Sequence, residues 1–224
     1  VWQAGSALAD AGTAAILDTA VAVLRSQGAV IVDAVELADI DKLADPEFAA
    51  LTHEFKHDIN AYLSGLSGEH PGDLAGLIDF NNRNAAEVLA DFGQELFEAA
   101  EATNGSLADP DYTEARSAAT RIARGGLDAV MTEHRLDAVL ALTGHPAWLT
   151  DHVLGDYHGW GTSGPAAVSG YPSVVVPAGR VRGLPVGISL TGPAWSEPRL
   201  IALAYAFELA RAAARGQDQA LWQR

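Results

Sequence analysis

The stretch from Gly170 to Gly192 restricts the fold more than any other part of the sequence. Two runs of mainly apolar and β-branched residues, Ser173–Val176 and Val186–Leu190, are each bounded by Pro and Gly, a pattern typical of β-strands. The link Ala178–Gly183 is short and carries two glycines, so we predict a β-hairpin. Because the valines at 174–176 do not alternate with polar residues, we expect this strand to lie in the middle of a sheet covered on both faces.

The N-terminal part of the sequence predicts a strand–helix–strand unit. We expect a short strand near Val1–Ala4, a helix from Thr13, as its cap, to Gln27, and a second strand over Ala29–Val35. A unit of this length implies two parallel strands joined by a right-handed crossover.

Most of the remaining sequence predicts helices. A helix from Asp45 to about Leu66 should bury one apolar stripe, which consists of Phe48, Leu51, Phe55, Ile59, Tyr62 and Leu66. Further helices are expected over 74–84 after the cap Asp73, over 87–103, over 110–134, and after the cap Ser196. A strand is expected over 136–142, and 144–170 is a long irregular segment of the kind that is often functional.

Composition limits the classes of partner. The chain of 224 residues carries 29 Asp and Glu against 14 Lys and Arg, so an acidic surface should repel nucleic acid and anionic membranes. It has no cysteine, which excludes disulfides and a thiol nucleophile. We expect a single domain over 1–224 with a polar tail at 216–224. Residues 1–5 do not resemble a signal peptide, so we expect a cytoplasmic protein, unless a signal precedes Val1.

One motif predicts a metal site that its context does not favour. His53-Glu54-Phe55-Lys56-His57 matches H-E-x-x-H, in which two histidines one helical turn apart bind zinc. The two histidines should point away from the buried stripe of their helix, and a histidine that would complete the longer zinc motif is replaced by Leu63. We therefore predict no metal site, and a zinc hydrolase is kept as an alternative function.

The sequence offers no complete nucleophile motif. Neither G-x-S-x-G nor S-x-x-K is present, and the only lysines, Lys42 and Lys56, lie in acidic, polar surroundings that would not lower their pKa for base catalysis. Gly159–Gly164 spells G-x-G-x-x-G, but it does not follow a predicted strand and it runs into Pro165. We predict a glycine-rich loop there, with no nucleotide cofactor and no catalytic residue in this chain.

Several spaced elements of the sequence together resemble the amidase signature family, amide hydrolases with a Ser–cis-Ser–Lys triad. The elements are Gly170-Tyr171-Pro172, Val176–Gly179, Gly183–Ile188, and Ser196-Glu197 at the start of a final helix. The resemblance implies an α/β fold in which a mixed β-sheet is covered by helices, and it places this chain in the C-terminal portion. The triad lysine and the Gly-Ser-Ser loop of the family lie upstream of the matched elements, and this chain contains no Gly-Ser-Ser. We therefore expect the 224 residues alone to be inactive.

The resemblance also implies a substrate-binding segment, because in the family the loop before the Gly-aromatic-Pro element borders the substrate cleft. The residues that it would contribute are Trp148, Tyr157, Trp160, Thr162 and Ser163. The expected partners are a small-molecule or peptide amide and an N-terminal half of the same enzyme. An alternative is a non-enzymatic module that only pairs with such a half, and an open sheet edge would also allow a homodimer.

Overall fold

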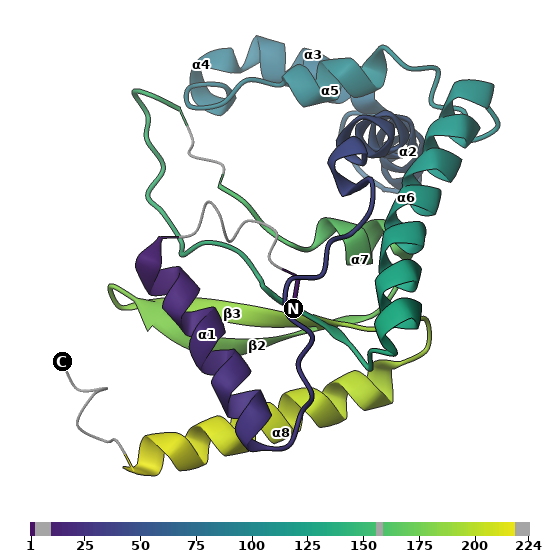
Figure 1. Cartoon of the computed structure of the whole chain (residues 1–224). Coiled ribbons are helices and arrows are strands. Elements are labelled where there is room, and N and C mark those ends of the chain that lie inside the picture. The colour runs from purple at the N-terminus through teal and green to yellow at the C-terminus, as the bar shows by residue number, and fades with distance from the viewer. Residues whose placement is uncertain (3–9, 156–158, 218–224) are drawn as a thin grey trace. The chain divides into compact units, whose positions relative to one another are not determined.

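The computed structural model of the chain describes residues 1–2, 10–155 and 159–217 (Figure 1). The chain forms two compact units, one from residues 1–40 and 123–224 and the other from residues 41–122. The first unit holds the sheet and the second is helical. The expected single domain over 1–224 stays a prediction, and most of the expected tail lies outside the described residues.

An antiparallel sheet forms the centre of the first unit. It consists of β1 (Val139–Leu142), β2 (Ser173–Val181) and β3 (Leu184–Thr191), in the order β1-β3-β2. The predicted hairpin is confirmed as β2 and β3, and its turn places Arg182 and Gly183 at φ values of 50° and 84°, the backbone twist that tight hairpins favour. The predicted central position of the valine run is wrong, because β2 lies at the edge of the three-stranded sheet and Val175 is 55% exposed.

Two helices cover one face of this sheet. These are α1 (Ala11–Ser26) and α8 (Glu197–Gln217), drawn purple and yellow beside the hairpin in Figure 1. Alternate residues of β3, including the fully buried Ile188, enter a cluster with apolar side chains of both helices. The buried members of this cluster are Val1, Ile16, Leu17, Ala20, Val21, Leu140, Leu142, Val176, Ala178, Val186, Ile188, Leu190, Leu200, Ala204 and Phe207. We call it the first core.

The opposite face of the sheet packs on the C-terminal part of α6 (Pro110–His134). This second core contains Trp2, Val35, Leu37, Leu127, Val130, Met131, Val139 and Ala141. The predicted helix over 110–134 is confirmed with both of its bounds. Pro110 occupies the first turn, where its missing N–H does least harm.

Two helix caps differ from the sequence prediction. The side chain of Asp10, rather than Thr13, caps α1 by accepting hydrogen bonds from the N–H groups of Gly12 and Thr13 at 2.8 and 3.2 Å. At the start of α8, the hydroxyl of Ser196 is buried and makes no hydrogen bond within the described residues. Ser196 therefore lies at the cap position of α8 without capping it through its side chain.

The predicted N-terminal strand–helix–strand unit is only partly formed. Trp2 and Val35 make an isolated parallel bridge, and neither Val1–Ala4 nor Ala29–Val35 forms a strand among the described residues. Residues 3–4 lie outside the described residues. Val30 is 92% exposed. The predicted strand over 136–142 also begins late, at Val139.

The second unit is built from helices. These are α2 (Ala44–Ser64), α3 (Leu74–Arg83), α4 (Ala85–Val88), α5 (Glu95–Glu101) and the N-terminal part of α6, and a 3₁₀ turn, η2 (Ile40–Lys42), leads into them. Asp73 caps α3 as predicted by accepting a hydrogen bond from the Gly76 N–H. The single helix predicted over 87–103 is wrong, because the non-helical residues 89–94 separate α4 from α5.

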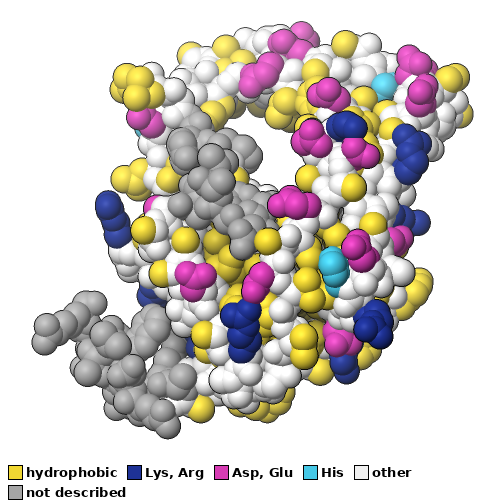
Figure 2. Space-filling view, viewed as in Figure 1, with side chains coloured by type: hydrophobic (Ala, Val, Ile, Leu, Met, Phe, Trp, Pro, Cys, Tyr) yellow, Lys and Arg dark blue, Asp and Glu magenta, His cyan; other side chains and the backbone are white. Residues whose placement is uncertain are grey.

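The second unit leaves much apolar surface open. The stripe of α2 was expected to be buried, yet Phe48, Leu51, Phe55, Tyr62 and Leu66 are 38–63% exposed. The unit is also the more acidic one, since residues 41–122 contain 16 of the 29 Asp and Glu residues but only 5 of the 14 Lys and Arg residues. Figure 2 shows carboxylate and apolar side chains side by side on the surface.

Candidate functional site

The long segment predicted to border a substrate cleft leaves the sheet at the C-terminal end of β1. The Thr143 N–H donates a hydrogen bond to the Gly187 carbonyl at 3.0 Å, which extends the pairing with β3 by one residue. The Thr143 hydroxyl lies 2.9 Å from the hydroxyl of Ser189. Ser189 is 6% exposed, so this pair fixes the first residue of the segment against the sheet.

Thr162 joins the two ends of the segment. Its N–H donates to the Thr143 carbonyl at 3.1 Å, and its hydroxyl donates to the Leu142 carbonyl at 2.6 Å. An antiparallel bridge between Gly144 and Gly161 lies beside these bonds. Thr162 is 5% exposed, so its hydroxyl holds the base of the loop.

Two of the predicted aromatic residues lie around His145. The ring centroids of His145 and Trp148 are 4.5 Å apart, and those of His145 and Trp160 are 6.5 Å apart. Trp160 is half-buried and packs against the first core, whereas Trp148 is 42% exposed. The three rings form an aromatic group. Its Trp160 side packs on the first core, and its Trp148 side is open to solvent. Tyr157, the third aromatic residue predicted for this site, lies outside the described residues.

Ser163 lies beyond Thr162, at the start of the six-residue helix α7 (Gly164–Ser169), which the sequence prediction of an irregular segment missed. The Ser163 side chain makes no capping hydrogen bond, and the residue is exposed. The two predicted hydroxyls therefore have different surroundings. The Thr162 hydroxyl is buried at the base of the loop, and the Ser163 hydroxyl lies on an accessible surface.

A turn shapes the outer part of the loop. One carboxylate oxygen of Asp151 accepts hydrogen bonds from the N–H groups of Val153 and Leu154, both at 2.9 Å. These bonds favour the charged carboxylate and lower the pKa of Asp151. The side chains of Val153 and Leu154 are 90% and 87% exposed. This turn, which follows Trp148 in the sequence, therefore exposes apolar side chains.

The Gly-aromatic-Pro element ends the segment and is tied to α6. The Arg124 Nε donates to the Ser169 carbonyl, and the Tyr171 hydroxyl donates to the Asp128 carboxylate, both at 2.8 Å. Burial raises the pKa of Tyr171, and the bond to Asp128 raises it further. Gly170 adopts the left-handed conformation at φ 72°, which explains why glycine stands there.

Sequence reasoning did not identify Thr143, His145 and Ser189 as part of this site. Thr143 and Ser189 are 46 residues apart in the sequence, and only the sheet register brings them together. Thr143 is a polar residue directly after the buried strand β1, which is the local signal that the sequence offers for it.

The histidines of the H-E-x-x-H motif make contacts within the second unit. His53 Nδ1 lies 3.0 Å from the Ala49 carbonyl, and the His53 ring packs near Tyr112 at 5.9 Å between centroids. His57 Nδ1 lies 3.3 Å from the Gly105 carbonyl. In the part of the chain that the structure describes, no three His, Cys, Asp or Glu side chains come together as a metal site would require. Nothing in this geometry supports the zinc alternative.

Lys56 of the same motif is held by its surroundings. Its ammonium group donates to the Glu101 carbonyl at 2.7 Å, to the Glu101 carboxylate at 3.0 Å and to the Thr103 carbonyl at 2.8 Å. Three bonds use all the donors of an ammonium group, so Lys56 closes the C-terminal end of α5.

Among the described helices, none has the length and apolar character of a membrane span.

Comparisons with known proteins agree on one family. The family model described as Amidase matches residues 1–201. A probable amidase of Arabidopsis thaliana is 34% identical over 201 residues, and the match covers 87% of this chain and 36% of the relative. The native peptide amidase from Stenotrophomonas maltophilia is 42% identical with a TM-score of 0.78, and the match covers 87% of this chain and 39% of that enzyme.

A more distant structure shares the fold. A bacterial aryl acylamidase of the amidase signature family is 20% identical with a TM-score of 0.64, and the match covers 90% of this chain and 40% of that enzyme. The chain thus spans about two fifths of the length of these relatives or less. The α/β fold class and the resemblance drawn from the sequence are confirmed. This chain belongs to the amidase family.

Proposed function

We propose that this chain is the C-terminal portion of an amide hydrolase and forms one wall of its substrate cleft. The observation that carries the proposal is the 42% identity to a peptide amidase over 87% of this chain, combined with a match to only 39% of that enzyme. The remaining polypeptide, upstream of Val1, would supply the nucleophilic serine, the cis-serine, the lysine and the oxyanion hole. The complete protein would hydrolyse an amide through an acyl-enzyme.

The lysines of this chain support the absence of catalysis by the 224 residues alone. A lysine acts as a base only when its amine loses its proton, which requires a desolvated site or a neighbouring positive charge. The ammonium of Lys56 instead donates three hydrogen bonds, one of them to a carboxylate. Lys42 is exposed in an acidic segment. These bonds support a structural rather than a catalytic role for Lys56.

The aromatic group around His145 would contact the substrate. Trp148 and Trp160 would supply the apolar wall and Ser163 an accessible hydroxyl, while Thr162 would keep the loop in place. Tyr157 remains part of the proposed wall. We propose a peptide amide as the preferred substrate, since peptide amidases are the similar structures with both high identity and high TM-score.

The test compares two polypeptides, the 224-residue chain and the complete protein with its native upstream sequence. Ammonia release is measured from peptide amides and from aryl amides. We expect the complete protein to hydrolyse peptide amides and the 224 residues to show no turnover. Turnover by the 224 residues alone, or a complete protein that hydrolyses no amide, contradicts the proposal. A stable association of the two parts without turnover would favour the non-enzymatic module instead.

A matched pair of tryptophans tests the wall. In the complete protein, Trp148→Ala should raise KM about 10-fold, which corresponds to about 1.4 kcal/mol of lost binding, with a smaller change in kcat. The control is Trp195→Ala, because Trp195 is 89% exposed and precedes α8, away from the loop in the sequence. Equal effects of the two substitutions would show that the aromatic group does not contact substrate.

A further inference from the structure

The imidazole of His145 is held inside the loop that follows β1. His145 comes directly after the bridge between Gly144 and Gly161, where the two ends of the loop lie side by side. Its Nδ1 lies 2.7 Å from the Pro146 carbonyl oxygen. Because a carbonyl oxygen only accepts, Nδ1 carries the hydrogen and donates it, and this bond fixes the orientation of the ring.

Gly159 provides the space that the ring fills. A Cβ atom at position 159 would lie 1.9 Å from Cδ2 and from Nε2 of His145, closer than two such atoms can approach. At Gly161, two residues later, a Cβ would lie 3.6 Å from the Thr143 carbonyl oxygen, an ordinary contact. The imidazole and the backbone of Gly159 therefore fit each other closely, and position 159 admits no side chain while the ring is in place.

The same ring contacts both described tryptophans of the proposed wall. Its centroid lies 4.5 Å from that of Trp148 at a tilt of 45°, and 6.5 Å from that of Trp160 in an edge-on arrangement. Both distances fall within the range over which aromatic rings attract each other. Trp160 packs against the first core, whereas Trp148 is 42% exposed. The imidazole thus connects the exposed indole of Trp148 to the buried part of the loop.

We propose that His145 is a positioning residue that sets the orientation of the Trp148 indole in the substrate wall. The flat ring carries this role, because Nδ1 already bonds to Pro146 and the ring face supports the indole. An indole that is ordered before the substrate arrives loses less freedom on binding. This inference rests on the proposed function in one respect, the contact between Trp148 and substrate.

The first test measures the mobility of Trp148 without any substrate. In the complete protein with ¹⁵N-labelled tryptophan, the indole N–H signal of Trp148 is assigned by its loss in Trp148→Phe. NMR relaxation then gives its order parameter. We expect a value close to that of rigid groups, about 0.85, in the unmodified protein and a value below about 0.6 in His145→Ala. An indole that stays ordered in His145→Ala overturns the proposal, whether or not the protein hydrolyses amides.

A second test uses the close fit between His145 and Gly159. Gly159→Ala must displace the imidazole, so it should raise KM for a peptide amide by about 5-fold, as His145→Ala should. In the His145→Ala background the added methyl group has room, so Gly159→Ala should then change KM by less than about 2-fold. The matched control is Gly161→Ala, which should leave KM within about 2-fold of the unmodified protein. Effects of the first two substitutions that multiply independently would overturn the proposal.

Two replacements of His145 separate the ring from the hydrogen bond. His145→Phe keeps a flat aromatic ring without a donor, and His145→Asn keeps a donor near the position of Nδ1 without a ring. We expect the Phe variant to retain the order of the Trp148 indole and the Asn variant to behave like the Ala variant. Thermal unfolding confirms that each variant is folded. The reverse result would show that the bond to Pro146 shapes the loop, and it would overturn the role of the ring.

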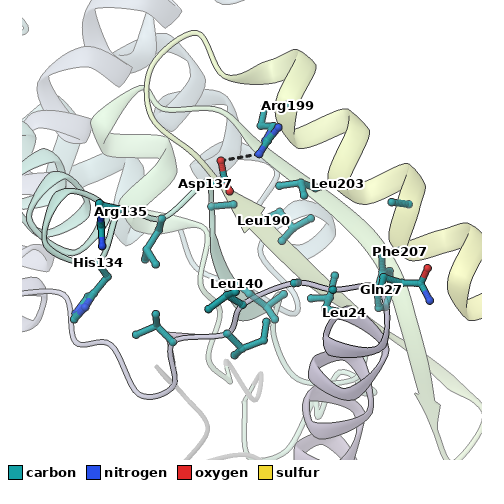
Figure 3. A pocket seen from close by; sticks show the side chains of 18 residues that line it. Leu24, Gln27, His134, Arg135, Asp137, Leu140, Leu190, Arg199, Leu203 and Phe207 are labelled. Carbon is teal, nitrogen blue, oxygen red and sulfur yellow. Dashed lines mark hydrogen bonds and ion pairs between the residues drawn. The ribbon is translucent and has the colours of Figure 1, made fainter.

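The kinetic constants distinguish positioning from general damage to the enzyme. His145→Ala should raise KM while kcat stays within about 2-fold, because the wall binds substrate and does not touch the reacting bond. The control is His134→Ala, an exposed histidine at the end of α6. It lines an apolar cavity of about 500 Å³ whose lining residues lie outside the loop (Figure 3).

This control should change neither constant. A fall in kcat with unchanged KM in His145→Ala, or an equal effect of His134→Ala, would overturn the proposal. A complete protein that hydrolyses no amide would contradict the proposed function, and the order parameter of the Trp148 indole would still decide the role of His145.

Discussion

The β2–β3 hairpin and the segment 29–35 have similar sequences and different structures. Both are rich in β-branched apolar residues, and both are predicted as strands. In the hairpin, β3 pairs with β1 on one side and β2 on the other, and Ile188 is fully buried. The segment 29–35 makes a single bridge through Val35, and Val30 is 92% exposed.

The difference shows that β-propensity describes how a residue fits a half-buried, paired surface. The hairpin carries its own partner, because a tight turn places the two strands side by side. The segment 29–35 has one bridge, between Val35 and Trp2, and no strand lies beside the rest of it among the described residues. A local β-branched pattern therefore predicts a strand reliably only where the fold supplies a paired neighbour.

The largest effect should separate the two segments directly. Ile188→Ala should lower the free energy of unfolding by about 2–5 kcal/mol, because it removes a fully buried side chain from the first core. Val30→Ala should change it by less than about 0.5 kcal/mol, since the side chain is exposed. Denaturant unfolding of both variants measures the contrast. Similar losses in the two variants would contradict it.

A smaller effect should appear at the C-terminal end of β1. Thr162→Val removes the hydroxyl that donates to the Leu142 carbonyl and leaves a buried acceptor without this donor, so we expect a loss of about 1–3 kcal/mol. Thr162→Ser keeps the hydroxyl and serves as the control. Equal stabilities of the Val and Ser variants, measured by denaturant unfolding, would show that the bond does not hold the loop.

The smallest effect compares the two glycines that precede the segments. Gly183 before β3 and Gly28 before 29–35 have φ values of 84° and 90°, where a Cβ is strained. Gly183→Ala should destabilise the protein by about 1–2 kcal/mol, because the paired hairpin cannot move to relieve the strain. Gly28→Ala should have a smaller effect, because residues 29–34 that follow it belong to no strand and can shift. Thermal unfolding of the two variants gives the difference, and a larger effect at Gly28 would reverse the comparison.

The sequence predicted elements whose signals are local. Asp109-Pro110 marks the start of α6, Asp73 caps α3, and the glycines between two mainly apolar, β-branched runs mark the hairpin. Elements that depend on distant neighbours were missed, including the exposed stripe of α2, the break between α4 and α5, and the late start of β1.

The same division holds for the candidate site. Composition and family resemblance predict the loop and its aromatic residues as a substrate-binding segment, and the structure places Trp148 and Trp160 around His145. The hydroxyl pair of Thr143 and Ser189 depends on the register of β1 with β3, which no local pattern specifies. The different roles of the Thr162 and Ser163 hydroxyls likewise follow from burial.

The uneven distribution of carboxylates gives the two units different responses to ionic strength. Residues 41–122 hold 16 acidic and 5 basic side chains, so these helices repel one another's charges at low salt. Dissolved ions weaken that repulsion over about 10 Å at 0.1 M. Added salt should therefore tighten the helical unit more than the sheet unit, and the concentration of simple electrolytes becomes a means of stabilising one part of the molecule selectively.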